Sequence, residues 1–541
     1  MRPRMHALVA AAVLALGFAA PAAHAAFGIQ DFTAEVRKAD NTTLETQAGA
    51  HPFAGVTSFT FNSTALGPDG HVKDIRVDLP PGLISNPQAT PRCTNAQFPN
   101  CPKETQVGTE QLTAQAGPAP VPYTAAVFNM ETGNDQVADF AFSVPAIAPR
   151  TDIVGGLRDR GDLGLFFTIS NIAQNSNLVA STLTFWGVPA DPAHDAERGG
   201  PSTAPPTPFL TLPTACAGVQ TTTLSADSYE APGQFVTKDA VTPTGATGCE
   251  ALPFTPQLSA IADGRTSEAN GAGLKVTIEQ PLEQSNVHSV SVVLPKQFSA
   301  RGSTVAAACP EATFRADPNG CAASRVGTVA AATPLLPDPL TGPVYLVAHA
   351  TGLPTIEALL QGHGLSIDLS GTITFTAAGL NSTFQTVPDA PITTFVLDLP
   401  TGPHSALSAS KGVCTGALTM PTTIVGQSGA RVERATPMTV TGCSASQPST
   451  TKLKVLSARV KGAVATLVVQ VPRAGTLTAR GTGLRKLSRK VTRAGKVTVK
   501  LRLSSSGRAL RARRQRAHRK LKVPVTLRLG SLKTSRTLTF K

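Results

Sequence analysis

Short segments in which apolar and polar side chains alternate recur along the chain, and Pro or Gly bounds most of them. Thr57–Phe61 and Asp74–Leu79 are examples, with Phe, Ile, Val and Leu on one face and Ser, Thr, Arg and Asp on the other. A period of two is typical of a half-buried β-strand. Many such segments at short spacing predict a mostly β protein made of Ig-like β-sandwich units.

The same pattern predicts where individual elements lie. One short helix is expected at 354–361, inside the second half of the chain. Strands are expected at 125–128, 138–144, 163–172, 178–186, 209–213, 274–279, 288–294, 342–349, 366–377 and 393–399.

One block of the sequence occurs twice. In both copies a Leu-Pro pair is followed by two cysteines and then by Val-Gly-Thr, which should open a strand. The copies therefore predict tandem repeat units, the first at 26–250 and the second at 251–443. If each unit holds two sandwiches, further boundaries are expected near 120 and 335. The matching positions are Leu79, Cys93, Cys101 and Val107–Thr109 in one copy, and Leu294, Cys309, Cys321 and Val326–Thr328 in the other.

The start of the chain has the pattern of a secretory signal peptide. Arg2 and Arg4 precede an uncharged run, and the small-residue pattern Ala23-His24-Ala25 predicts cleavage after Ala25. The apolar run is too short to span a bilayer, and no later stretch approaches the roughly 18 to 20 apolar residues of a membrane helix. Leu399–Gly402 lacks the spacing and the tail of a covalent wall-sorting signal. We therefore expect an exported protein whose attachment to a cell surface is non-covalent.

The eight cysteines agree with export. Because a short and then a longer loop occur in each copy, we expect neighbours in the sequence to pair, as structural staples in an oxidising compartment. A zinc site, the alternative, would need C-x-x-C pairs or partnering histidines, and the sequence has neither. The expected pairs are Cys93 with Cys101, Cys216 with Cys249, Cys309 with Cys321, and Cys414 with Cys443.

Charge divides the chain at a polar linker, 444–451. Beyond it, 451–541 holds 26 Lys and Arg and no Asp or Glu, whereas 26–450 carries a net charge of −14. Val497, Val499 and Leu501 alternate with Thr and basic residues, which predicts a small β-sandwich at 452–541 with a cationic face. A short helix within 504–521 concentrates the candidate polyanion-binding residues Arg511, Arg513, Arg514, Arg516, Arg519 and Lys520.

The basic domain has three interpretations. It is a solvated charged face, a binding module for an anionic polymer such as cell-wall material, lipid headgroups or extracellular nucleic acid, or a dock for the acidic body of the same or a neighbouring chain. Export argues against an intracellular nucleic-acid partner. So does the composition of the domain, because Phe540 is its only aromatic residue and stacking of bases needs aromatic platforms.

Motifs for nucleophile elbows, zinc hydrolases, calcium loops and nucleotide binding are absent from the sequence, so no cofactor is expected and the chain favours a non-catalytic role. His363, between two glycines, fits a turn better than a general base. One constellation stands out: Trp186, the only tryptophan, precedes Asp191, His194 and Asp195, which together could ligate a divalent ion or flank a sugar site. The alternative is a capped turn beside a buried tryptophan.

Paired carboxylates for glycoside cleavage are defined by their separation in space, which the sequence does not give. One Trp and three Tyr are few for a sugar-binding cleft, and this argues against a glycosidase or a strong lectin.

With these residues the chain resembles a group of large, secreted, repeat-containing proteins of high-GC actinobacteria. The resemblance rests on Asp78–Leu83 up to Cys93, on Trp186–Pro192 and on the Lys/Arg-rich C-terminal domain, and it covers most of the mature chain. It implies export and repetition and no particular activity. The second copy departs from the pattern, with Lys296 and Gln297 where the first has Pro81 and Gly82.

The leading hypothesis is thus a secreted, non-catalytic, surface-associated protein of adhesion or structural type, held to anionic cell-surface polymer by its basic C-terminal domain. Two alternatives remain: a secreted hydrolase or carbohydrate- or metal-binding protein centred on the loop at 186–195, and a protein that self-assembles head to tail through its charge split.

Overall fold

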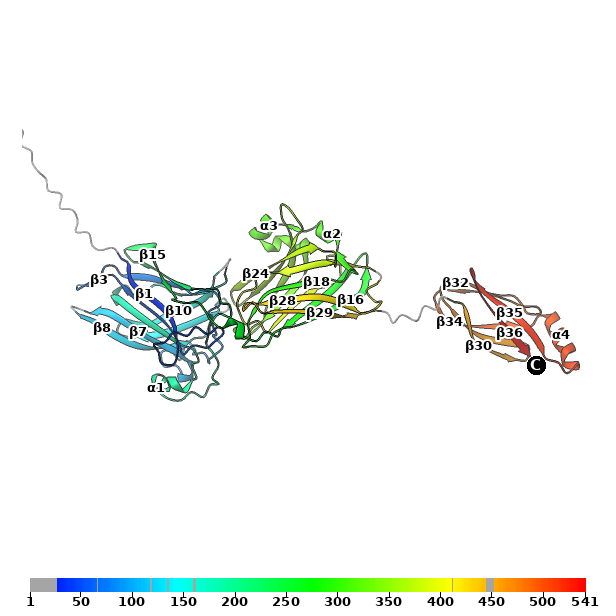
Figure 1. Ribbon diagram of the computed structural model, residues 1–541, viewed down its shortest axis with the longest axis horizontal. Helices are drawn as coiled ribbons and strands as arrows, with labels where there is room; N and C mark the ends of the chain where they lie inside the picture. Colours follow the sequence, from blue (N-terminus) through cyan, green and yellow to red (C-terminus); the bar gives the residue numbers. More distant parts are fainter. Residues whose placement is uncertain are drawn as a thin grey trace, which may run out of the picture. The chain divides into compact units, whose positions relative to one another are not determined.

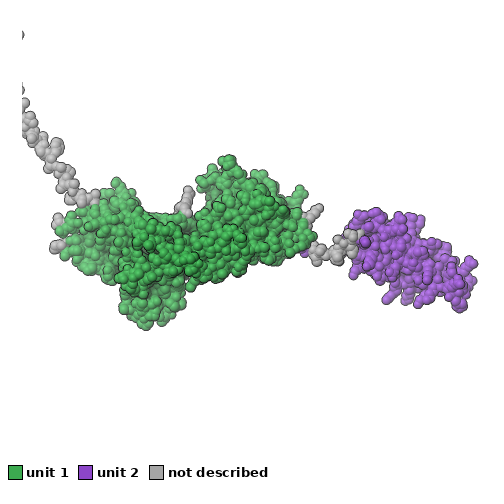
Figure 2. All heavy atoms as spheres, viewed as in Figure 1, with its two compact units in different colours: residues 1–442 green, residues 443–541 purple. Residues whose placement is uncertain are grey.

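The computed structural model describes residues 27–65, 67–116, 119–133, 136–158, 162–410, 412–443 and 452–541 (Figure 1). The expected signal peptide at 1–25 and the expected linker at 444–451 lie outside these residues. The chain divides into two compact units, one that ends at Gly442 and one that comprises Cys443–Lys541 (Figure 2).

The first repeat forms one sheet of eleven strands in the order β1-β2-β12-β7-β8-β9-β10-β11-β5-β14-β15. The sheet curls on itself, because the edge strand β1 lies beside the other edge strand β15 and Lys238 Nζ donates to the carbonyl of Gln30. The strands are β1 (Ile29–Arg37), β2 (Ala54–Phe61), β5 (Val72–Asp78), β7 (Gln106–Ala116), β8 (Ala119–Asn129), β9 (Ala138–Val144), β10 (Ala148–Leu157), β11 (Leu165–Ile169), β12 (Leu178–Trp186), β14 (Thr221–Ser228) and β15 (Ala231–Val241).

The second repeat closes completely. Its strands run β16-β17-β26-β21-β22-β23-β24-β25-β18-β28-β29, and β29 pairs in parallel with β16 to complete the ring. They are β16 (Gln257–Ser267), β17 (Gly271–Glu279), β18 (Val287–Val293), β21 (Arg325–Ala332), β22 (Leu340–Ala348), β23 (Thr355–Gly362), β24 (Leu365–Phe375), β25 (Leu380–Phe384), β26 (Thr394–Leu399), β28 (Leu418–Gly426) and β29 (Arg431–Thr441).

The two repeats therefore share one strand order, in the sheet and along the chain. Their short accessory pairs also match: β6 (Ile84–Ser85) with β13 (Leu210–Thr211) in the first, and β19 (Phe298–Ala300) with β27 (Leu407–Ala409) in the second. The mostly β prediction is confirmed, but the Ig-like sandwich is wrong for these repeats. A twisted sheet of this many strands curls until its edges meet, so each repeat is one barrel-like sheet around its own core.

The internal boundaries expected near 120 and 335 are also wrong. The hairpin of β7 and β8 spans the first position, and the hairpin of β21 and β22 spans the second. Both hairpins belong to continuous sheets, so neither position separates two domains.

Disulfides join the neighbouring cysteines, as expected: Cys93 with Cys101, Cys216 with Cys249, and Cys309 with Cys321. Cys414 and Cys443 are disulfide-bonded as well. The first cysteine of each block makes the same backbone contact, a parallel bridge from Cys93 to Met130 and from Cys309 to Val347. The duplication thus extends to the stapled loops.

The turn after Leu-Pro is kept in both copies despite its different residues. Leu83 N donates to Pro80 O at 3.3 Å, and Phe298 N donates to Pro295 O at 2.8 Å. Gly82 has a φ of 81°, so the first turn uses a conformation that favours glycine. Lys296 and Gln297 close the second turn without a positive φ.

The helix expected at 354–361 is wrong, because these residues form β23 between β22 and β24. The strand is buried on both faces: Ile356 and Leu360 belong to the core of the sheet, and Leu359 packs beneath a cap. A strand covered on both sides loses the alternation by which strands are recognised. The cap consists of α3 (Glu311–Ala316) and η5 (Pro318–Ser324), stapled by Cys309 and Cys321.

The second compact unit contains two small sheets around an apolar core, in the orders β30-β31-β34 and β33-β32-β35-β36. Alternation along β34 directs Val499 and Leu501 inward and Lys500 and Arg502 outward, as the sequence predicts. The elements are β30 (Lys454–Lys461), β31 (Val464–Val471), β32 (Gly475–Arg480), β33 (Leu487–Val491), β34 (Gly495–Arg502), α4 (Ser505–Arg516), β35 (Leu521–Leu529) and β36 (Leu532–Phe540).

Asp389 links the two repeats within the first compact unit. Its carboxylate accepts hydrogen bonds from Thr214 N at 2.7 Å, Thr214 Oγ1 at 2.6 Å, Ala215 N at 3.0 Å and Asn286 Nδ2 at 2.8 Å. Thr214 lies in the first repeat, and Asn286 and Asp389 lie in the second. One carboxylate therefore satisfies donors from both repeats.

We expect Asp389→Ala to lower the free energy of unfolding by about 2–3 kcal/mol, because it leaves several partly buried donors without an acceptor. Urea denaturation followed by circular dichroism measures the change. Asp338→Ala, at an exposed position, is the control and should have almost no effect. Equal stability of the two variants would contradict the proposed role of Asp389.

Candidate functional site

The loop after β12 places the sequence-predicted residues around a buried histidine. The imidazole of His194 is 1% exposed and lies between two aromatic rings, 4.6 Å from the centroid of Trp186 and 4.5 Å from that of Phe53. Trp186 is itself buried, and its Nε1 donates to Glu197 Oε2 at 2.9 Å. Burial lowers the pKa of His194 to about 4, so the ring is neutral at pH 7.

The two carboxylates of the loop have other partners. Asp191 Oδ1 accepts from Ala193 N at 2.8 Å and caps η3 (Pro192–His194). Asp195 opens α1 (Asp195–Arg198) and pairs with the buried guanidinium of Arg198. Among the residues described, no group of three His, Cys, Asp or Glu side chains is arranged to hold a metal ion. The structure thus gathers Asp191, His194 and Asp195 in one loop, where Asp191 caps a helical turn, His194 packs between aromatic rings and Asp195 pairs with Arg198.

His363 occupies the tip of the hairpin between β23 and β24, with a φ of 52°. This is the turn position that the flanking glycines predict.

One network resembles a hydrolytic triad in the order of its groups. His349 Nδ1 lies 2.9 Å from Glu311 Oε2, and its Nε2 lies 2.9 Å from Thr355 Oγ1. The Thr355 hydroxyl, however, donates to Glu357, so its proton is not directed at the imidazole as a nucleophile's would be. The pKa of Asp368 beside it is raised to about 7 by burial and by Glu357. The network joins α3, His349 directly after β22, and residues of β23 and β24, and it fastens the cap to the sheet.

Two further buried carboxyl groups lie in the first repeat. Burial raises the pKa of Glu110 to about 8, although the Ser181 hydroxyl donates to it at 2.6 Å, and burial together with Asp152 raises that of Asp139 to about 7. A raised carboxyl pKa is common at catalytic sites, but it also arises wherever an acid is buried in a fold. Neither residue lines the cavity described next.

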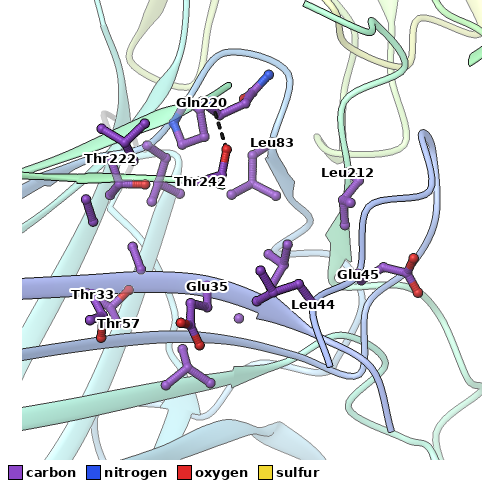
Figure 3. A pocket seen from close by; sticks show the side chains of 18 of the residues that line it. Thr33, Glu35, Leu44, Glu45, Thr57, Leu83, Leu212, Gln220, Thr222 and Thr242 are labelled. Atoms are coloured by element: carbon purple, nitrogen blue, oxygen red, sulfur yellow. Dashed lines mark hydrogen bonds between the residues drawn. The ribbon is translucent and has the colours of Figure 1, made fainter. Parts of the chain in front are cut away.

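The first repeat has a cavity of about 360 Å³ at the seam where β1 and β15 approach each other (Figure 3). Its apolar lining includes Phe167, Leu183 and Phe185. Thr33 of β1, Thr57 of β2 and Thr222 of β14 also line it. Glu35 and Glu45 stand at its rim. Apolar walls with a few polar groups are typical of a binding pocket. No local sequence pattern indicates this site, because it forms between the first and the last strand of a repeat.

The basic helix α4 is anchored at its start and exposed along the rest. Ser504 Oγ caps the helix by accepting from Gly507 N at 3.1 Å, and a side chain on Gly507 would meet the carbonyl of Gly483 at 2.0 Å. Arg511 Nε donates to the carbonyl of Lys541 at 2.7 Å, which places that guanidinium against the end of the chain. Arg513, Arg514 and Arg516 are exposed in the last turn, and Arg519 and Lys520 are exposed after the helix ends.

We expect the free energy of unfolding to fall between pH 6.5 and pH 4 because of His194. The unfolded histidine gains a proton below about pH 6.5, whereas the folded one resists protonation down to about pH 4. The stabilisation present above pH 6.5 is therefore lost as the pH falls, by roughly 2–3 kcal/mol. Urea denaturation at pH 7.5 and pH 4 should show a smaller pH-dependent loss for His194→Phe than for the wild type.

Carboxyl groups titrate in the same range, so the quantity to compare is the difference between wild type and variant at each pH. His288→Phe, on the exposed side of β18, is the matched control. If His194→Phe and His288→Phe had the same pH dependence, the buried neutral state of His194 would be refuted.

Four disulfides are typical of proteins that fold in an oxidising compartment. Within the part of the chain that the structure describes, no helix is both long and apolar enough to cross a membrane.

Comparisons with known proteins do not identify a family. No family model matches the chain, and no curated protein matches it. Among solved structures it is similar to the BSP domain of a biofilm-associated protein, with 9% identity, a TM-score of 0.18, and coverage of 95% of this chain and 81% of that one. It is also similar to Escherichia coli alpha-2-macroglobulin activated by porcine elastase (11%, TM-score 0.14, 95% and 44%) and to the human desmocollin-1 ectodomain (8%, TM-score 0.16, 81% and 92%). At these TM-scores the likenesses carry no argument about fold or function.

Proposed function

We propose that this chain is a secreted, non-catalytic, surface-associated protein that attaches to an anionic polymer through its basic C-terminal unit. The observation that carries the proposal is that residues 452–541 have their own apolar core while their 26 basic side chains have no acidic side chain in the unit to neutralise them. Such a module attracts polyanions by neutralising their charges and releasing their counterions.

The distribution of charge over the unit supports the proposal. Lys496, Lys500 and Arg502 follow the exposed side of β34, and Lys522 and Arg528 follow that of β35. The alternation that builds the core thus puts cations on the outer faces of both sheets. A polymer with closely spaced negative groups can contact many of these side chains at once.

The helix α4 adds the densest group of cations. Arg513, Arg514 and Arg516 lie in its last turn, where the helix dipole favours positive charge, and Arg519 and Lys520 follow. Guanidinium groups bind carboxylate and phosphate in a two-pronged way that lysine cannot reproduce. We therefore assign the strongest polymer contacts to this end of α4.

Export supports an extracellular partner. The sequence at 1–25 has the order of a secretory signal peptide, and the paired cysteines fit an oxidising compartment. Anionic polymers of the cell surface are then the polyanions within reach, and intracellular nucleic acid is not.

The test is retention of the mature full chain on immobilised heparin and on polygalacturonate, compared with the chain that ends at 451. We expect the full chain to bind at 50 mM salt and to be released as salt rises, since affinity falls with the logarithm of salt concentration in proportion to the contacts made. The shortened chain should not bind. Weak binding with an affinity that does not change with salt concentration would refute the proposal.

A pair of charge variants locates the contacts. Replacing Arg513, Arg514, Arg516, Arg519 and Lys520 by Gln should lower the affinity by at least about tenfold at 100 mM salt and flatten the salt dependence. The matched control replaces five exposed lysines on the strands, Lys490, Lys496, Lys500, Lys522 and Lys533. Both variants lose five charges, so an equal effect would show that the whole cationic surface, and not α4, determines binding.

Light scattering separates polymer binding from self-assembly. A chain that docks on the acidic body of a neighbour would form oligomers at low salt without any polymer, and we expect the protein to stay monomeric there.

A further inference from the structure

The two repeats close differently at the seam between the first and the last strand. In the second repeat β29 pairs in parallel with β16, from Ala260 with Met438 to Asp263 with Thr441. Met438 is buried in the core and Val440 packs against it. The side chains of the closing strand thus complete the core of that repeat.

In the first repeat the corresponding strands do not pair, since β1 and β15 are the two edges of the sheet. The strand β15 ends at Val241, and Pro243, which has no backbone N–H, follows. Thr247 then bonds to a different segment: its N donates to Thr46 O at 2.7 Å, and its carbonyl accepts from Ala48 N at 2.8 Å. The chain therefore passes the seam without forming a ladder with β1.

The outcome is an opening in the wall of the sheet. Lys238 bridges to Gln30 at one end, and the Thr46–Thr247 contact closes the other. Between them lies the 360 Å³ cavity, with Phe32 and Phe185 in its wall. In the second repeat, Met438 and Val440 of the paired last strand belong to or pack against the core. The cavity of the first repeat lies where its last strand does not pair with its first.

The free edge of β1 carries backbone groups that suit a peptide. The carbonyl of Val36 in β1 accepts from Glu45 N at 2.9 Å on the side away from β2. Because residues two apart in a strand direct their backbone groups to the same side, the even-numbered residues of β1 direct their N–H and C=O groups away from β2. Phe32 and Ala34 share that direction, and on this side of β1 no described strand forms a ladder with it. An acyl chain would fill the cavity but would leave these N–H and C=O groups without partners.

The charges beside the opening favour a basic partner. Glu35, Glu45 and Asp239 lie at its rim, and the repeats as a whole are acidic. Glu35 pairs with Arg37 at 2.7 Å, whereas Asp239 accepts only from the hydroxyl of Thr223 among the contacts described. Val241, 59% exposed on the outer face of β15, adds an apolar contact next to the opening.

We propose that the seam between β1 and β15 binds an extended peptide segment of a partner protein, which adds to β1 as a parallel strand. Its apolar side chains alternate into the cavity, and Lys or Arg side chains face the carboxylates outside. Recognition by strand addition obtains affinity from backbone hydrogen bonds and specificity from alternate side chains. This site is independent of polymer attachment by the C-terminal unit.

The probe is a fluorescent ten-residue peptide that alternates Val and Lys and is blocked at both ends. We expect saturable binding to the full chain, measured by fluorescence anisotropy. Methylating the amides of alternate residues removes the donors along one edge of the strand. One of the two methylated peptides should bind about tenfold or more weakly, and the other within about twofold of the parent, because only one edge faces β1.

Two variants place the site on the molecule. Ala34→Trp fills the cavity and should abolish binding, whereas Asp31→Trp adds the same side chain at an exposed position of the same strand that does not line the cavity and should preserve it. Amide hydrogen exchange gives a second measurement in the unaltered chain: the peptide should protect the amides of Phe32 and Ala34, while that of Thr33, which faces β2, should not change.

Three results would overturn the proposal. These are no saturable binding of the peptide, equal loss of binding for both methylated peptides, or binding of dodecylamine in the cavity by a protein that ignores the peptide. The last would mean that the cavity takes an apolar small molecule and that the free edge of β1 has no part in recognition. Because the methylated peptides test the wild-type chain, misfolding of Ala34→Trp would not leave the question open.

Discussion

A sheet with one apolar face must cover that face, and each of its edge strands leaves a row of backbone groups unpaired; these two constraints shape the first compact unit. A flat sheet of eleven strands would expose two rows of unpaired backbone groups and one whole apolar face. Curling brings the first and last strands together, so the apolar face becomes an enclosed core. In the second repeat the edges are joined by hydrogen bonds between β16 and β29, and in the first the edges β1 and β15 only approach each other. The same strand order can therefore end in a closed barrel or in a barrel with an open seam.

The second compact unit covers its apolar faces in another way, by packing two short open sheets around one core. Its core is built almost wholly from Val and Leu, and its surface charge comes from the residues between them. Because one alternation supplies both, the cationic surface is a direct result of how the unit folds. Stability and charge are thus properties of the same strands.

Much of this could be read from the sequence where the signal is local. Strands at 138–144 and 178–186 were expected with the bounds that β9 and β12 have, and the pairing of neighbouring cysteines followed from the duplicated spacing. Errors arose where burial removed the signal. The segment at 354–361 is covered by the core on one side and by Phe314 and its neighbours on the other, so its apolar run has no alternation to indicate a strand.

The closure of the sheets could not be predicted from the sequence, for another reason. Whether β1 meets β15 depends on contacts between residues about 200 positions apart, such as Lys238 and Gln30, which no local pattern records. The same holds for His194, whose spacing from Asp191 suggested a metal ligand while Phe53, from a distant loop, determines its surroundings. Long-range contacts decide both the seam and the chemistry of the loop.

The shared strand order of the two repeats has a consequence for how the protein folds. Two neighbouring stretches of one chain that seek the same arrangement can exchange equivalent segments before either has finished, a known hazard of tandem repeats. Here the loops, the cap over β23 and the end of the last strand differ between the copies. Such divergence makes a segment from one copy a poor replacement in the other. Dissimilarity between the two repeats thus disfavours the exchange of segments between them during folding.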